Sequence, residues 1–271
     1  MGWQLIPNTV QVMGILNVTP DSFSDGGRYH VLDAALRHTE QMLLDGVDII
    51  DIGGESTRPG AADVDTATEL ERVVPVIEAI RARFDVPISV DTSKPTVMAA
   101  AVNAGANIIN DVRALQEPNA VETCATLSVP ICLMHMQGLP RSMQHDPQYK
   151  DVVGDVCQFF TERITTCERA GITRSRLILD PGFGFGKTLE HNVALLRGLD
   201  TFLDFQLPLL VGVSRKSMIG TLLGNRSVDE RLHGSIAAAV IAAMKGSSII
   251  RVHDVKATVD AMKIVQAVCQ R

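Results

Sequence analysis

The chain has 271 residues, of which 46% are hydrophobic, so it is long enough to form one domain around a large core. A formal net charge of -6 argues against a nucleic-acid-binding surface, and no uninterrupted apolar stretch is long enough to cross a bilayer. The five cysteines are odd in number and lack the paired spacing of a metal site, and the N-terminal residues do not resemble a secretion signal. We therefore expect a single cytoplasmic domain over residues 1–271, with no membrane or nucleic-acid partner.

Eight short apolar runs follow one another along the chain, and each ends in a polar residue. They cover residues 12–17, 47–54, 87–92, 107–112, 130–136, 177–182, 208–213 and 248–253. Helical patterns lie between them, for example over residues 33–46, 70–84, 152–171 and 233–246. This alternation predicts parallel βα units, and eight such units close into an α/β protein of the TIM (β/α)8 barrel type. The polar residues then fall at the carboxyl ends of the strands, where barrels of this kind carry their chemistry.

Two connections are longer than usual for a βα unit. Residues 18–29 are rich in turn formers, and residues 55–69 follow the glycine pair at 53–54. Long ordered loops are commonly functional, although two surface insertions without a role are the alternative. The stretch 137–151 is interpreted as a rim loop before a barrel helix. The small-residue pattern at 233–246 favours close packing on the barrel over packing on a second subunit.

Polar residues at four strand ends suit a nitrogen-rich heterocycle. A pterin edge presents neighbouring N–H donors that a carboxylate accepts in pairs, and an amide matches both donors and acceptors. Asp91, Asn110 and Asp180 are the candidates, with Lys216 donating to a ring carbonyl or ring nitrogen. The alternative is that Asp91 and Asp180 only cap the helices that follow them.

A second group of strand-end residues suits a diphosphate. It comprises Asn17, Thr57, Arg58, Arg251 and His253. Arginine combines charge with forked donors, histidine adds a further donor, and the amide oxygen of Asn17 suits a hard Mg²⁺ ion. Strand alternation places Arg251 and His253 on the same side of their strand, which strengthens the pair.

Two further features contribute to the predicted pocket. Ser217 lies near a predicted helix start, where backbone N–H groups favour a carboxylate, although an ordinary serine cap would look the same. The segment GFGFGKT at 182–188 resembles a phosphate loop, but Pro181 occupies the position of its required first glycine. These glycines are better explained by close approach of the backbone to a flat ligand, with Phe183 or Phe185 beside it.

The motifs also resemble those of a known family. MGILNVTPDSFSDGG and DIGGESTRPGA are similar to the two signature stretches of the bacterial dihydropteroate synthases. SVDTSKP, IINDVRAL, LMHMQG, LDPGFGFGKT, GVSRKSMIG and IRVHDV are similar to the later motifs of that family, in the same order. The resemblance covers essentially the whole chain, and no motif is interrupted.

The resemblance implies an activity and a role for each candidate residue. The family condenses (7,8-dihydropterin-6-yl)methyl diphosphate with 4-aminobenzoate, uses Mg²⁺, releases diphosphate in folate synthesis, and suggests a homodimer. Carried over, Asn17 binds the metal, Thr57 and Arg58 lie near the diphosphate, and Arg251 and His253 hold the leaving group. The pterin is held by Asp91, Asn110, Asp180 and Lys216, and the aminobenzoate pocket, which sulfonamides would share, is formed by Ser22, Phe23, Pro59, Phe185 and Ser217.

Two other functions fit the same barrel. A pterin-binding methyltransferase would act with a corrinoid partner and would need no aminobenzoate site. A non-catalytic paralogue would be expected to have eroded loops or to lack the anion group. The intact TPDSFSDGG, STRPG and SRKS stretches favour the synthase.

Overall fold

A computed structural model describes residues 3, 5–6, 9–19, 28–56, 63–138 and 143–269, and within these ranges strands and helices alternate from end to end. The strands are β1 (Gln11–Asn17), β2 (Ile49–Gly53), β3 (Ile88–Asp91), β4 (Ile108–Asp111), β5 (Ile131–Met134), β6 (Leu177–Asp180), β7 (Leu210–Val211) and β8 (Ile249–Val252). The α-helices are α1 (Arg28–Leu44), α2 (Thr66–Arg83), α3 (Pro95–Ala104), α4 (Ala120–Thr126), α5 (Val152–Arg169), α6 (Leu189–Arg197), α7 (Ser217–Leu222), α8 (Leu232–Met244) and α9 (Val255–Cys269).

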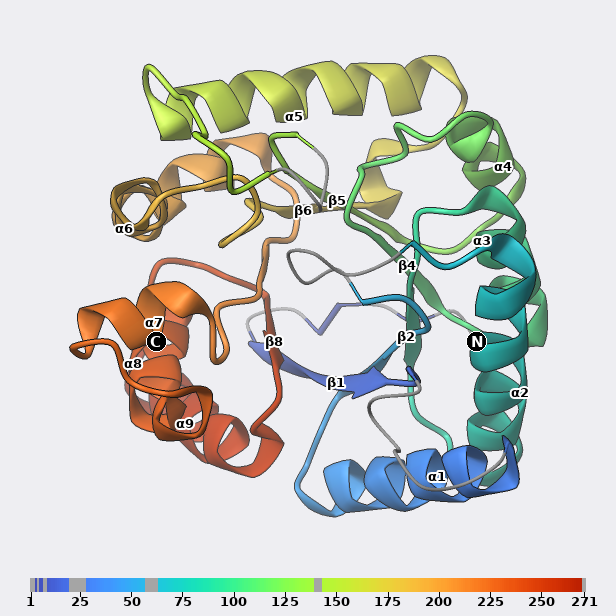
Figure 1. Cartoon of the computed structure of the whole chain (residues 1–271). Coiled ribbons are helices and arrows are strands. Elements are labelled where there is room, and N and C mark those ends of the chain that lie inside the picture. The colour runs from blue at the N-terminus through green and yellow to red at the C-terminus, as the bar shows by residue number, and fades with distance from the viewer. Residues whose placement is uncertain are drawn as a thin grey trace.

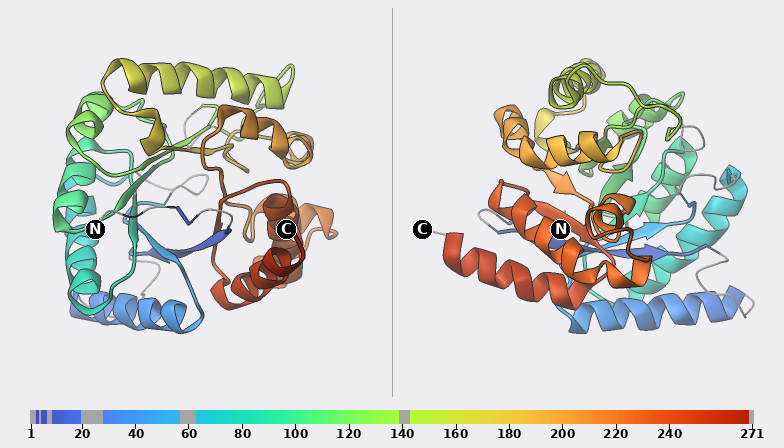
Figure 2. Two further views of the ribbon diagram at one scale, coloured as in Figure 1. Left: turned by 180° about the vertical axis from the view of Figure 1, so that it is seen from behind. Right: turned by 60° about the vertical axis from the view of Figure 1, so that its left-hand side comes forward.

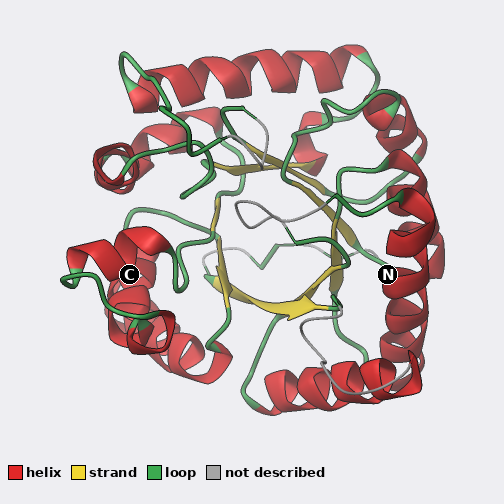
Figure 3. Ribbon diagram, viewed as in Figure 1, coloured by secondary structure: helices red, strands yellow, loops and turns green. Residues whose placement is uncertain are grey.

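The eight strands form a parallel barrel. They pair in the order β6-β5-β4-β3-β2-β1-β8-β7, and a parallel bridge between Leu179 and Leu209 joins the two ends of this sheet. Figure 1 looks down on the ring of strands with the helices outside it, and Figure 2 gives the views from behind and from the side. Colouring by secondary structure separates the inner strands from the outer helices (Figure 3). The predicted (β/α)8 barrel is therefore confirmed.

The elements differ from the predicted ones mainly at their ends. Helix α1 begins at Arg28, inside the stretch expected to be a loop. Strand β7 has only two residues, because the chain leaves the sheet at Gly212 toward the turn that carries Lys216. Among the described helices, none combines the length and the apolar character that spanning a bilayer would require.

The helices pack against the barrel through their apolar faces. Helix α5 buries a stripe at the helical spacing, formed by Val152, Val156, Phe160, Ile164 and Cys167. Helix α8 buries alanines, which let it approach the strands closely, so the predicted packing of 233–246 on the barrel is confirmed. Its Ile241 and Met244 remain exposed on the opposite side.

The inside of the barrel is arranged in layers. An apolar floor takes one buried residue from each of seven strands: Met13, Ile49, Ile108, Cys132, Ile178, Leu210 and Ile249. Trp3 and Leu5 pack against this floor. Because alternate residues of a strand point to the same face, the residues two positions further along each strand form the next interior layer. Most residues of that layer are polar or charged, and they begin the candidate site.

Candidate functional site

Four charged residues and an amide occupy the layer above the apolar floor. Asp51, Asp91, Asn110, Asp180 and Arg251 come from five strands, each two residues beyond Ile49, Ser89, Ile108, Ile178 and Ile249 respectively. The strand register sets Asp91 beside Asn110 and Met134 beside Asp180. The sheet therefore brings together the three residues predicted to bind a heterocycle, and it places Asp51 beside them.

Arg251 is the centre of this layer. Its Nε donates to Asp51 Oδ2 at 2.6 Å, and its Nη2 donates to Asp91 Oδ2 at 2.8 Å. The amide of Asn110 donates to the same Asp51 oxygen at 3.2 Å. Asp51 is fully buried, so its carboxylate is stabilised by these two donors. The guanidinium thus cross-links two carboxylates at the bottom of the mouth.

The electrostatics of this layer follow from two acids sharing one guanidinium in a buried place. Burial raises the pKa of Asp91 to about 7, although Arg251 opposes the shift, and the nearby Asp51 adds to it. Burial lowers the pKa of Arg251, but the carboxylates of Asp51 and Asp91 outweigh this and raise it above its ordinary value. Arg251 is a permanent cation here, whereas Asp91 is poised to bind or release a proton near neutrality.

Asp180 and Lys216 lie on the other side of the mouth. Asp180 Oδ1 accepts a hydrogen bond from the Gly182 amide at 2.8 Å, and burial raises the pKa of this carboxyl while Lys216 lowers it. The Lys216 ammonium donates to the Phe183 carbonyl and lies 4.7 Å from the centre of the Phe185 ring. Burial lowers the pKa of Lys216 to about 8, with Asp180 opposing the shift.

The capping alternative is wrong for Asp91. Helix α3 begins at Pro95 after Lys94 and has no side-chain cap, while the Asp91 carboxylate faces Arg251. Asp180 does hold a local backbone amide, but that amide belongs to a turn and not to a helix, since α6 starts only at Leu189. Both aspartates therefore lie in the barrel mouth, as the heterocycle interpretation requires.

Only three of the five residues predicted to bind an anion lie within the described residues: Asn17, Arg251 and His253. Asn17 ends β1, and a Cβ built on Gly53 would lie 3.6 Å from both Asn17 Oδ1 and Asp91 Cβ, so these two side chains border the same gap. His253 follows β8, is exposed, and its Nδ1 lies 3.1 Å from Ser214 Oγ. Arg251 points instead to the two aspartates of the layer.

The remaining predicted residues divide into two sets. Ser217 is the first residue of α7, which confirms its place at a helix start, and Phe185 is half-buried beside Lys216. Phe183, the other aromatic suggested for a flat ligand, is wholly buried in the core and cannot line the pocket. Five of the predicted residues lie outside the described residues: Ser22, Phe23, Thr57, Arg58 and Pro59.

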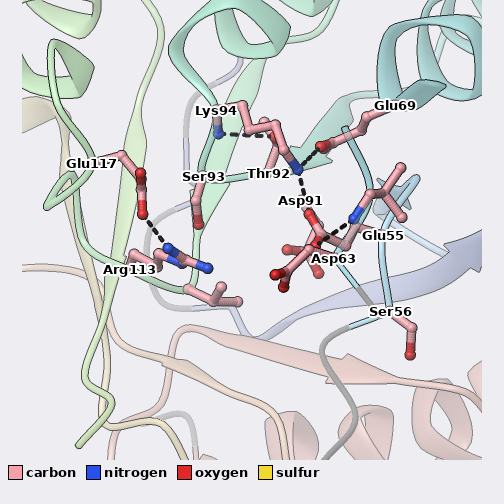
Figure 4. Close-up of a pocket in the computed structure, with 12 residues that line it drawn as sticks. Glu55, Ser56, Asp63, Glu69, Asp91, Thr92, Ser93, Lys94, Arg113 and Glu117 are labelled. Atoms are coloured by element: carbon pink, nitrogen blue, oxygen red, sulfur yellow. Dashed lines mark hydrogen bonds and ion pairs between the residues drawn. The ribbon is translucent and has the colours of Figure 1, made fainter. Parts of the chain in front are cut away.

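Sequence reasoning missed several polar residues of the mouth. Asp51 sits inside an apolar run, and only its spacing of two from Ile49 could have placed it in the barrel interior. A cavity of about 170 Å³ is lined by Asp91, which was predicted, and otherwise by residues that were not. There, Lys94 donates to Glu69 at 2.5 Å and also pairs with Glu55 (Figure 4). The buried Lys187 was likewise overlooked.

The model of a family described as "Pterin binding enzyme" matches residues 13–253. The chain belongs to this family, the pterin-binding enzymes. It is 60% identical to the dihydropteroate synthase of Escherichia coli K12 over 256 residues, 94% of this chain and 90% of the relative. It is 52% identical to that of Neisseria meningitidis serogroup B over 95% of this chain and 92% of the relative. Within the family, the chain has the activity of the dihydropteroate synthases, which are transferases.

Solved structures give the same result. The Yersinia pestis dihydropteroate synthase in a sulfonamide drug complex superposes with a TM-score of 0.91 at 58% identity, covering 98% of this chain and 95% of that one. The Xanthomonas albilineans enzyme with 4-aminobenzoic acid gives 0.92 at 50% identity, over 97% and 94% of the two chains. The same enzyme with 7,8-dihydropteroate gives 0.88 at 48% identity, over 97% and 95%.

Proposed function

We propose that the barrel mouth condenses (7,8-dihydropterin-6-yl)methyl diphosphate with 4-aminobenzoate, and that the residues of the polar layer hold the pterin. The observation that carries this proposal is the convergence of Asp91, Asn110, Asp180 and Lys216 on one mouth above an apolar floor. Carboxylates accept the ring N–H and amino groups, the Asn110 amide matches a mixed edge, and Lys216 donates to the ring carbonyl or a ring nitrogen. The identity to synthases favours this function over a methyltransferase or a non-catalytic paralogue.

Pterin binding is proposed to exchange partners at Asp91. In the structure the Arg251 guanidinium donates to the Asp91 carboxylate. A pterin N–H group that takes this acceptor would release one arm of Arg251, which stays tethered to Asp51 by its Nε. The released arm would then be available to the diphosphate. The exchange couples recognition of the ring to neutralisation of the leaving group.

The reaction needs no protein nucleophile. The bond between the methylene carbon and the diphosphate oxygen breaks, and the positive charge that develops spreads over the pterin ring. The amine of 4-aminobenzoate then attacks the methylene carbon and loses a proton, which completes the new C–N bond. Arg251 and His253 stabilise the negative charge of the departing diphosphate, and a closed mouth keeps water from capturing the cation.

Mg²⁺ fits the residues of this mouth. Mg²⁺ in proteins is commonly bound by one or two side-chain oxygens together with substrate phosphates, and Asn17 Oδ1 is such an oxygen, bordering Asp91 across Gly53. When bound, the ion would withdraw charge from the diphosphate as a Lewis acid. In an Asn17→Ala variant, the Mg²⁺ concentration for half-maximal turnover is expected to rise. An unchanged requirement would remove Asn17 from the metal site.

The aminobenzoate is proposed to bind second. Phe185 and Ser217 lie near Lys216, whereas the other proposed contacts, Ser22, Phe23 and Pro59, and the proposed diphosphate neighbours Thr57 and Arg58 lie outside the described residues. We expect bound diphosphate to help complete the pocket, so 4-aminobenzoate alone is expected to bind poorly. Sulfonamides would compete at this pocket. Tight calorimetric binding of 4-aminobenzoate to the ligand-free protein would contradict this order.

We also propose a cytoplasmic homodimer. All five cysteines are free thiols, and Cys124, Cys132 and Cys167 are buried, which suits a reducing compartment. Exposed apolar side chains on α8 and α9, among them Met244 and Ile264, are candidates for the subunit contact. Sedimentation equilibrium of the purified protein tests this state, and a monomer at micromolar concentration would overturn it.

The pterin site is tested by Asp91→Asn and Asp180→Asn. Each change keeps the shape but opposes a ligand N–H with another donor, so pterin affinity measured by calorimetry should fall about tenfold or more. Asp200→Asn, on the exposed side of the barrel, serves as the control and should bind normally. Diphosphate release with each substrate omitted in turn, with and without Mg²⁺, tests the reaction. Unchanged pterin affinity in both aspartate variants would disprove the placement.

A further inference from the structure

A buried lysine lies behind the pterin side of the mouth. Lys187 ends the loop between β6 and α6, and only 3% of its surface is exposed. Its Nζ lies 2.9 Å from His135 Nδ1, 2.9 Å from the Gly182 carbonyl and 3.0 Å from the Phe185 carbonyl. A longer contact of 3.3 Å reaches the His135 carbonyl. The lysine therefore ties the end of β5 to the loop after β6.

These contacts match an ammonium group. An ammonium has three N–H donors, one for each of the three acceptors that lie within 3.0 Å of Lys187 Nζ. His135 must then be neutral, with its Nδ1 accepting. Burial, with the charge of Lys187 adding to it, lowers the pKa of His135 to about 3, in agreement with this state. Burial lowers the pKa of Lys187 too, while the Asp180 carboxylate raises it.

The loop that Lys187 holds has its backbone carbonyls anchored by side chains. Besides the two carbonyls bound by Lys187, the Phe183 carbonyl accepts from Lys216, the Gly184 carbonyl from Gln144 at 2.5 Å, and the Gly186 carbonyl from Tyr149 at 2.8 Å. Five successive carbonyls, 182 to 186, are thus fixed by side chains. Of these anchors, Lys187 is the most deeply buried and the one that holds two carbonyls.

The loop in turn fixes two groups of the mouth. The amide of Gly182, whose carbonyl Lys187 binds, donates to Asp180 Oδ1. The Phe183 carbonyl accepts from Lys216, and the Phe185 ring lies under the same ammonium. A change in the path of residues 182–185 would therefore move both the acceptor and the donor proposed for the pterin.

We propose that Lys187 is a positioning residue for pterin binding, acting through the 182–186 loop on Asp180 and Lys216. This inference rests on the pterin placement proposed above. Without the ammonium, the Phe185 carbonyl and His135 Nδ1 would be buried acceptors lacking this donor, and the Gly182 carbonyl would keep only the Phe185 amide at 3.1 Å. The loop would then have to move to hydrate these acceptors. Lys187 itself has no role in touching substrate.

The test is Lys187→Met, which keeps an unbranched apolar side chain as far as Cε and removes the ammonium with its charge and donors. Calorimetric affinity for a pterin without phosphate is expected to fall about tenfold. The matched control is Arg176→Met. Arg176 is a half-buried cation that directly precedes β6, at the end of that strand opposite to Asp180, and it donates to the carbonyls of Val129 and Cys124. Both variants should lower the melting temperature, but only Lys187→Met should weaken pterin binding.

A second pair of measurements separates positioning from general stability. In Lys187→Ala, propylammonium added at millimolar concentration should restore part of the pterin affinity, whereas 1-propanol of the same size should not. Should Lys187→Met fail to fold, Lys187→Gln, which keeps two donors, is compared with Arg176→Met in the same way. Wild-type pterin affinity in a folded Lys187 variant would overturn the inference.

The two proposals fail in different ways. Asp180→Asn tests the pterin placement by itself. If Asp180→Asn binds pterin normally, the placement of the pterin is wrong. If Asp180→Asn loses affinity and the Lys187 variants do not, the placement stands and the positioning role is wrong.

Discussion

Arg251 on β8 and Asp51 on β2 form an ion pair of 2.6 Å that reaches across β1, which pairs with both strands. The two residues are 200 positions apart in the chain. The Asp51 side chain is completely buried, and that of Arg251 is 21% exposed. The pair therefore links the second strand of the chain to the eighth at the place where the substrate is proposed to bind.

Asp51→Asn should destabilise the fold. It removes the charge that compensates the buried guanidinium, although Asp91 remains as a partner, so we expect a loss of about 2–4 kcal/mol in the free energy of unfolding. Urea denaturation measures this. Asp200→Asn breaks an exposed pair with Lys245, and solvent screening should leave the free energy of unfolding almost unchanged. Equal losses in the two variants would contradict the importance of the buried pair.

Asp91 should make stability depend on pH. Its pKa is about 7 in the fold against an ordinary value of 3.8, so between these values the folded state binds more protons than the unfolded state. Stability attributable to Asp91 is therefore present at acidic pH and lost as the pH rises from about 4 to 7, by up to ~1.4 kcal/mol per pH unit. The wild type should lose about 2 kcal/mol relative to Asp91→Asn between pH 5 and pH 7.5. Parallel stability curves for the two proteins would count against the raised pKa.

Lys216 should limit activity at alkaline pH. Its pKa is about 8, so the ammonium that is proposed to donate to the pterin is lost as the pH rises through that value. The ratio kcat/KM should consequently fall above about pH 8. In Lys216→Arg, whose guanidinium keeps its proton, any residual activity should not fall until a higher pH. An alkaline limb unmoved by this substitution would assign the titration to another group.

Gly182→Ala should be far more damaging than Gly171→Ala. Both glycines have positive φ, 69° and 89° respectively. A Cβ on Gly182 would lie 1.8 Å from the His135 carbonyl oxygen, whereas a Cβ on Gly171 would meet nothing within 4 Å. Gly171→Ala should cost about 1 kcal/mol for the backbone conformation alone, and Gly182→Ala at least ~3 kcal/mol, because β5 or the loop must move. Calorimetric unfolding of the two variants compares these losses directly.

The barrel, and the level of the site within it, can be predicted from the order of the residues alone. Eight buried runs separated by helical patterns leave few alternatives to parallel βα units, because each apolar strand must be covered by a helix. The positions of Asp91, Asn110 and Asp180 at strand ends followed from the same pattern. Asp51 was not predicted as a site residue, because a charged residue within an apolar run does not indicate which side chain it will pair with.

Which of these groups contact one another depends on how the barrel closes. The register of the closed sheet sets Arg251 against Asp51 and Asp91, where the sequence had suggested a diphosphate ligand for its side chain. The same closure buries Lys187 among carbonyls from two connections, so that a residue passed over in the sequence becomes an anchor of the mouth. Alternation along a strand is a local property that the sequence carries, whereas contacts between strands depend on the stagger with which the barrel closes.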